Sequence, residues 1–177
     1  MAVFQTIKQM LLPVRPVRAE AVIPAPETRY AIQPLTSKSV RELVRLNARC
    51  FLNGENYTKA TFAYLLNDPE TISYQMLTEA GEMVGFIFAI RNTNGTAHLT
   101  TIGIAPEHRR RGLASRLLEH LEGRLAEKGL SIVALEVRVS NTTAQALYQM
   151  AGYACVQRLD SYYHNGEDGF LMTKSLF

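Results

Sequence analysis

The stretch TIGIAPEHRRRGLASRLL, residues 101–118, is the part of the sequence that best indicates the fold. Its apolar start predicts a strand that ends at Pro106, and the leucines that follow predict a helix beginning at about Gly112. When a strand leads into a helix through a short glycine-containing loop, free backbone N–H groups and the positive end of the helix dipole point at one spot. Such a spot binds an anion, most often a phosphate.

The residues of this loop favour a phosphate ligand. Gly112 has no Cβ, so a bulky anion can approach the main chain, and the three arginines before it offer forked donors. Neither GxxxxGKS/T nor GxGxxG is present, which excludes the two other common phosphate loops of this shape. The alternative is a basic first turn on an ordinary surface helix.

The motif RRRGLA, residues 109–114, resembles the Q/R-x-x-G-x-G/A acyl-coenzyme A signature of the GNAT N-acetyltransferases. The segments LEVRVSN at 135–141, ALY at 146–148 and GY at 152–153 follow in the order and spacing of the RimI-like protein N-terminal acetyltransferases of that family. The resemblance is strong over residues 72–176, weaker over 30–71 and absent before residue 30. It implies a GNAT-like α/β fold with a central mixed sheet and a splayed pair of parallel strands.

Periodicity and turn signals predict the same class of fold from the residues themselves. Strands are predicted at 30–35, 72–78, 83–91, 96–104, 131–139, 153–159 and 170–173, and helices at 37–51, 58–66, 112–128 and 141–150. Asn94-Gly95 is a hairpin signal, so 96–104 should run antiparallel to the strand before it. A helix joins 96–104 to 131–139, so these two should be parallel in a right-handed crossover. The prediction is a mixed sheet of about seven strands flanked by about four helices.

Length and composition limit the classes of function. A chain of 177 residues with 47% hydrophobic residues is predicted to form one domain. The net charge of +3 is too small to indicate a nucleic-acid partner, and no apolar run is long enough to cross a membrane. Cys50 and Cys155 form no CxxC pair, so we expect no metal and a reducing, cytoplasmic location. The histidines show no ligand spacing and are each expected to be surface or core residues: His98, His108, His120 and His164.

Residues 1–29 are expected to lie outside the catalytic domain, which would span 30–177. They are rich in proline and share nothing with the family pattern. We predict a mobile extension with at most one helical turn near residues 3–12. A targeting peptide is the alternative, although the segment lacks serine.

The resemblance implies that acetyl-coenzyme A binds where the two parallel strands part. Main-chain groups of the first strand would contact the pantetheine arm, and the loop after it would hold the pyrophosphate. The residues implied are Ile102, Gly103, Ile104, Arg109, Arg110, Arg111, Gly112, Leu113, Ala114 and Ser115. Asn141 is expected to contact the cofactor, to cap the helix that follows it, or to do both.

Glu136 is the candidate general base for the acceptor amine. It interrupts an otherwise apolar strand, where burial would make its carboxylate a better proton acceptor. The alternative is a surface glutamate paired with Arg138. The resemblance places the proton donor to the departing thiolate at Tyr148, for which the alternative is a tyrosine packed in the core.

Two segments resemble the parts that grip the substrate in protein N-terminal acetyltransferases. Glu55 and Tyr57 lie between the first two predicted helices, and Tyr162 and Tyr163 lie in the loop before the last strand. The alternatives are a plain helix–helix connection and a loop in which one tyrosine fills the core.

The sequence therefore predicts an enzyme that transfers acetyl from acetyl-coenzyme A to the α-amine of a protein or peptide, with a ribosomal protein among the candidate partners. Two alternatives stay open. One is an acetyltransferase of a small amine such as an antibiotic or polyamine, and the other is a non-catalytic acyl-coenzyme A-binding or partner subunit.

Overall fold

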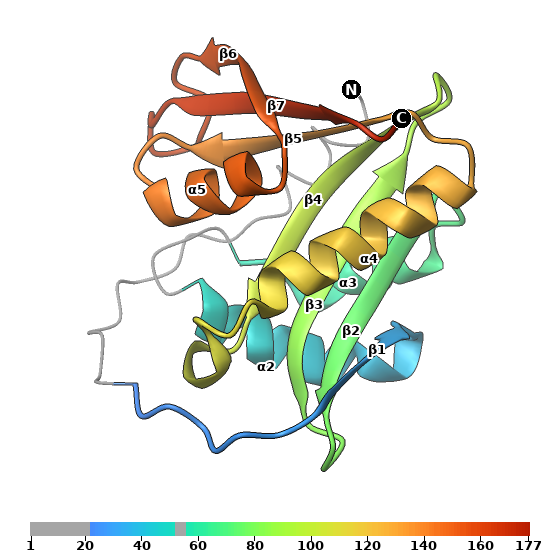
Figure 1. The fold of residues 1–177 in the computed structure, drawn as a ribbon, viewed down its shortest axis with the longest axis vertical. Coiled ribbons are helices and arrows are strands. Elements are labelled where there is room, and N and C mark those ends of the chain that lie inside the picture. The colour runs from blue at the N-terminus through green and yellow to red at the C-terminus, as the bar shows by residue number, and fades with distance from the viewer. Residues whose placement is uncertain (1–21, 52–55) are drawn as a thin grey trace.

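The structure, a computed structural model, describes residues 22–51 and 56–177. At its centre lies a seven-stranded sheet of order β1-β2-β3-β4-β5-β7-β6 (Figure 1). Its strands are β1 Tyr30–Pro34, β2 Thr71–Thr78, β3 Met83–Arg91, β4 Thr96–Ile104, β5 Ile132–Arg138, β6 Ala154–Leu159 and β7 Gly169–Ser175. The α-helices are α2 Val40–Cys50, α3 Lys59–Asn67, α4 Leu113–Glu127 and α5 Thr142–Met150, and short 3-10 turns span Ser37–Ser39 and Pro106–His108.

These elements confirm the predicted α/β fold. Each predicted strand and helix is present, with ends that differ from the expected ones by a few residues at most. The largest difference is at the first helix, where the turn Ser37–Ser39 is 3-10 and the α-helix begins at Val40.

The core lies on both faces of the central strand β3. Helix α4 crosses one face of the sheet, while α2 and α3 lie behind the other (Figure 1). The α4 stripe predicted from leucine spacing is fully buried: Leu113, Leu117, Leu118, Leu121 and Leu125. On the opposite face Phe62 of α3 packs with Phe86 and Phe88, its ring centroid 6.1 and 5.6 Å from theirs. Because both faces are covered, β3 is an almost unbroken apolar run.

The pairing between β4 and β5 is short, and this divides the sheet. The two strands run parallel and pair only at Thr96–Ile132, Ala97–Val133 and His98–Ala134. Beyond His98, β4 stays with β3 and β5 stays with β7, and the two strands diverge (Figure 1). The β3–β4 register shifts opposite Phe88 and Ala89, skipping Thr100, and such a bulge bends a strand. The predicted splayed parallel pair is therefore present, and the bulge lies where it opens.

Candidate active site

Glu136 and His98 meet where β4 and β5 part. Oε2 of Glu136 lies 2.6 Å from Nε2 of His98, and both side chains are 13% exposed. Glu136 follows Ala134 by two residues on β5, so it lies on the same strand face, just past the last rung of the parallel ladder. The pair brings together residues that are 38 positions apart in the sequence.

Arg138, the alternative partner for Glu136, bonds to residues of the loop before β7. Its guanidinium donates to Glu167 (2.8 Å) and Asn165 (3.1 Å), and lies 3.8 Å from the centre of the Tyr163 ring. Among the described residues, Glu136 pairs with His98, and Arg138 bonds to Glu167 and Asn165. The carboxylate of Glu136 contacts an imidazole instead of a guanidinium.

Tyr148 lies in α5, nearly out of contact with solvent. Its side chain is 7% exposed and its ring packs 5.7 Å from that of Tyr153. Burial raises the pKa of the Tyr148 phenol above its usual range, so the hydroxyl keeps its proton at neutral pH. The ring belongs to the core, as the alternative held, and the hydroxyl is in the protonation state that a proton donor needs.

The N-terminus of α4 presents open backbone donors. Gly112 precedes the helix with φ 71°, and within the described residues no side chain caps this end. The first N–H of this turn to find an intrahelical acceptor is that of Arg116, which bonds to Gly112 at 3.1 Å. The N–H groups of residues 113–115 precede it and sit at the positive end of the helix dipole. Arg110 also has positive φ, 63°, and left-handed residues in a turn help gather N–H groups into an anion-binding concavity.

The arginines on either side of Arg110 contact the protein itself. Arg109 donates to the carbonyls of Ile104 and Cys50, both at 3.1 Å. Arg111 donates to Pro26 O (3.0 Å), to Ala25 O and to the hydroxyl of Tyr30 (2.7 Å). Their guanidinium groups thus hold the shape of the loop, whereas the exposed Arg110 has no such bond among the residues that the structure describes.

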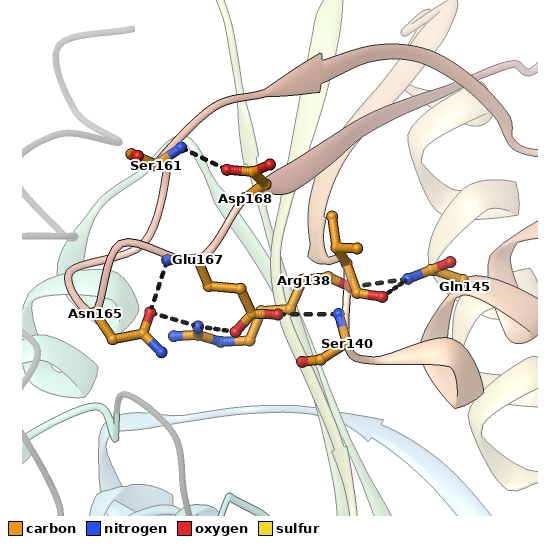
Figure 2. Close-up of polar contacts among 8 residues, drawn as sticks. Arg138, Ser140, Gln145, Ser161, Asn165, Glu167 and Asp168 are labelled. Atoms are coloured by element: carbon orange, nitrogen blue, oxygen red, sulfur yellow. Dashed lines mark hydrogen bonds and ion pairs between the residues drawn. The ribbon is translucent and has the colours of Figure 1, made fainter.

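The N-terminus of α5, in contrast to that of α4, is capped by a side chain. Asn141 caps it by accepting a hydrogen bond from the Ala144 N–H at 3.1 Å, as one alternative predicted. The N–H of Ser140 donates to Oε1 of Glu167 at 2.9 Å, and Gln145 donates to the carbonyls of Arg138 and Val139 (Figure 2). This turn is fixed by side chains of the protein.

The loop with Tyr162 and Tyr163 is fastened to the end of β5. Figure 2 shows Glu167 reaching Arg138 and Ser140, while Asp168 accepts from the Ser161 N–H at 2.8 Å. Hydrogen bonds from Ser140, together with Arg138, lower the pKa of Glu167 to about 2. The two tyrosine rings meet edge to face at 5.1 Å, and both are half-buried.

The structure describes only part of the first predicted substrate segment. Tyr57 is buried, packs against Phe62 and donates its hydroxyl to Thr100 O at 3.2 Å, next to the opening between the strands. Asn56 is bonded to Asn47 and to the carbonyl of Phe51. Glu55 lies outside the described residues.

Metal-ligand clusters and membrane-spanning helices are both absent from the described ranges 22–51 and 56–177. No group of three or more His, Cys, Asp or Glu side chains there could hold a metal ion. None of the helices in those ranges is long and apolar enough to span a bilayer.

Comparison with known proteins decides the family. The sequence model of the Acetyltransferase (GNAT) family matches residues 40–153. The chain belongs to this family. The match covers most of the sheet, the loop before α4, Glu136 and Tyr148.

Individual relatives of this GNAT acetyltransferase agree. Over 121 residues it is 35% identical to the ribosomal protein bS18-alanine N-acetyltransferase of Escherichia coli, a match that covers 66% of this chain and 78% of that protein. It is 39% identical over 80 residues to a Saccharolobus solfataricus protein named N-alpha-acetyltransferase, a match that covers 45% of this chain and about half, 48%, of that relative. The crystal structure of the ribosomal-protein-S18-alanine N-acetyltransferase from Escherichia coli superposes with a TM-score of 0.76 at 28% identity, covering 84% of this chain and 94% of that one.

GNAT acetyltransferases bind acetyl-coenzyme A, and the geometry of this chain fits such a ligand. The parted strands leave β4 and β5 unpaired with each other beyond His98, and the open α4 terminus suits a diphosphate. Ile102, Gly103 and Ile104 lie on β4 in the stretch that has left β5.

His98 is the residue at this site that sequence reasoning missed. It was expected to be an ordinary surface or core histidine, because no metal-like spacing singled it out. A signal was present nonetheless: in the strand 96–104 it is the one ionisable residue, and its parallel neighbour carries the one carboxylate. Only the strand register brings the two together.

Proposed function

We propose that this acetyltransferase moves the acetyl group of acetyl-coenzyme A to the α-amine of a protein or peptide, by direct attack of the amine. The observation that carries the proposal is the position of Glu136, at the point where β4 and β5 separate and on the sheet that leads to the open end of α4. The names of the E. coli and S. solfataricus relatives support an α-amine acceptor, and the former makes a ribosomal protein a candidate partner.

In the proposed complex the loop before α4 binds the diphosphate through its main chain. The donors are the N–H groups of 110–115, that is of Arg110, Arg111, Gly112, Leu113, Ala114 and Ser115, and the Arg110 guanidinium adds a charge. Arg109 and Arg111 contribute by holding the loop, since their side chains already bond to backbone carbonyls. Ile102, Gly103 and Ile104 would pair with the pantetheine arm much as a peptide adds to a sheet edge. Asn141 would add a contact while it caps α5.

Glu136 serves as the proposed general base. An amine attacks only when neutral, and an α-amino group has a pKa of about 7.7–8.0 against about 10.4 for lysine, which makes its deprotonation about 3 kcal/mol easier at pH 7. The bound acetyl-coenzyme A supplies a thioester as acyl donor. Glu136 accepts the amine proton, and Tyr148, which burial keeps protonated, donates to the departing sulfur.

The proposed acceptor site lies between two flanking segments. Tyr162 and Tyr163 sit in a loop that Glu167 and Asp168 hold in place, so their rings would grip a peptide backbone without further ordering. Tyr57 is fixed beside the opening by its bond to Thr100, and we propose that it contacts the acceptor peptide there.

A thiol-release assay with acetyl-coenzyme A tests this function. The panel holds a short peptide with an N-terminal alanine, the same peptide with its α-amine blocked and an internal lysine free, and spermidine. We expect release only with the free α-amine. Release with spermidine alone would instead show a small-amine acetyltransferase, and calorimetric binding of acetyl-coenzyme A without release would show a non-catalytic subunit.

A further inference from the structure

His98 holds the carboxylate of Glu136 from the neighbouring strand. The contact is short, 2.6 Å from Nε2 to Oε2, and 13% of each side chain is exposed. Exposed ion pairs are flexible and contribute little, whereas a hydrogen bond between two largely buried groups keeps both in one geometry. The imidazole therefore sets the direction in which the carboxylate points.

The strand register explains why this contact forms. His98 is the last residue of β4 that pairs with β5, and its partner there is Ala134. Glu136 is the next residue of β5 on that face. Because Ala134 carries only a methyl group, the imidazole has room to reach the carboxylate. Beyond the pair of His98 and Ala134, the two strands are no longer paired, so they would not hold two facing side chains in register.

A histidine suits this position better than the nearby arginine would. Arg138 follows Glu136 by two residues on the same face of β5, but Glu167, Asn165 and Tyr163 hold its guanidinium. A permanent cation would stabilise the ionised carboxylate and make it a weaker base. A neutral imidazole can donate Nε2–H to the carboxylate without adding a fixed charge.

We propose that His98 is the positioning residue of the general base. Its Nε2–H donates to Oε2 of Glu136 and keeps Oε1 directed at the acceptor amine. This rests on the proposed function, in which Glu136 takes the amine proton: the N–H bond of the amine breaks, an O–H bond forms at Oε1, and His98 keeps its own proton throughout.

Two amide substitutions separate positioning from packing. The side-chain amide nitrogen of glutamine reaches about as far as Nε2 of histidine, while that of asparagine reaches only about as far as Nδ1. We expect His98→Gln to keep kcat within about threefold of the wild type and His98→Asn to lower it at least about tenfold, with KM for acetyl-coenzyme A unchanged in both. Equal kcat in the two variants, or a loss confined to KM, would overturn the proposal.

A double-mutant cycle links the effect to Glu136. In a Glu136→Gln background, His98→Asn should cause no further loss of kcat, because the base that it positions is already absent. A full further tenfold loss would show that His98 acts elsewhere and would overturn the proposal. The matched control is His120→Asn: His120 lies on α4 with its ring 4.5 Å from that of Tyr74, so its replacement should leave kcat unchanged.

The same variants show which of the two proposals fails. If Glu136→Gln keeps wild-type turnover, the base assignment is wrong and the role of His98 falls with it. If Glu136→Gln is slow while His98→Asn is not, only the role of His98 is wrong. Thermal unfolding is measured for each variant, and if His98→Asn does not fold, His98→Leu replaces it, since leucine fills much of the volume without a donor.

Discussion

Two helices of this protein begin just after a strand of the parallel pair, and they begin in opposite ways. At α4 the residue before the helix is Gly112, which offers no capping side chain, and no described residue caps the first N–H groups. At α5 the Asn141 side chain caps the turn, and Glu167 binds the Ser140 N–H just before it. An open helix terminus is a site for an outside anion, whereas a closed one is a rigid support. In the proposed function, the cofactor is bound on the α4 side, and the catalytic groups, Glu136 and Tyr148, lie on the β5–α5 side.

The largest effect that tests this division is expected at Glu136. Glu136→Gln removes the proton acceptor while keeping shape, so kcat should fall at least about tenfold and toward the hundredfold that general bases contribute. Affinity for acetyl-coenzyme A, measured by calorimetric titration, should stay near that of the wild type. A variant that turns over normally, or that loses cofactor affinity instead, would break the division of roles.

The next effect concerns the open terminus. Gly112→Leu should weaken coenzyme A binding about tenfold, because the side chain occupies the approach of the diphosphate. The strain of a side chain at φ 71°, about 1–2 kcal/mol, should instead lower the stability of the fold. An added Cβ at Gly112 meets no atom of the described residues within 4 Å, so those residues leave room for it.

Gly129 gives a matched control for this change. It follows the other end of α4 and has φ 76°, and an added Cβ there also meets nothing within 4 Å in residues 22–51 and 56–177. Gly129→Leu should lower the melting temperature about as much as Gly112→Leu but leave coenzyme A affinity unchanged. Equal coenzyme A affinities in both variants would contradict the proposal that the loop before α4 binds the diphosphate.

A smaller effect, about fivefold on kcat, is expected for Tyr148→Phe. A thiol like cysteine has a pKa of about 8.5, so its thiolate leaves with little need of a proton, and the raised pKa of Tyr148 makes this phenol a weak acid. Tyr153→Phe is the control, because Tyr153 is equally buried and its ring lies 5.7 Å away. The same kcat in both variants would leave Tyr148 as a core residue.

The smallest expected effect is on stability, and it concerns Glu167, which bonds to the turn before α5. The pKa of Glu167 is about 2 in the folded protein, below its usual 4.5, so this carboxylate stabilises the fold above about pH 4.5 and loses that contribution as the pH falls toward 2. Glu167→Gln should lower the free energy of unfolding at pH 7 by less than about 1 kcal/mol, since the side chain is partly exposed.

Urea unfolding at pH 7 and at pH 2 measures this difference. The curves of Glu167→Gln and the wild type should converge at pH 2. The exposed pair of Arg124 and Glu127 provides the control, and Glu127→Gln should cost nothing measurable at either pH. If the Glu167 variant keeps the same deficit at pH 2, the contribution of this residue is not electrostatic.

The elements that could be predicted are those with strong local signals. The Asn94-Gly95 hairpin, the leucine stripe of α4 and the Gly112 start are set by turn chemistry and periodicity within a few residues. The parallel pairing of β4 and β5 followed from the helix predicted between them, and the splay followed from the family resemblance.

The features that were missed depend on long-range register. The pairing of His98 with Glu136 requires that His98 stand opposite Ala134, which nothing local in either strand specifies. Likewise, three arginines in a row are chemically alike in the sequence. Only the fold shows that two of them bond to the carbonyls of Ile104, Cys50, Ala25 and Pro26, whereas Arg110 has no such bond among the residues that the structure describes.

The hydrogen bonds from Arg111 to Ala25 and Pro26 have a practical consequence. The guanidinium joins a stretch of chain ahead of β1 to the residue just before Gly112, and the Ala25 N–H adds a bond to the carbonyl of Glu107. A fluorophore attached to a side chain near residue 22 would therefore lie on the stretch that bonds to the turn before α4, whereas the exposed Phe177 is not among the described residues bonded to that turn. For binding measurements, the carboxyl end is the safer place to modify this protein.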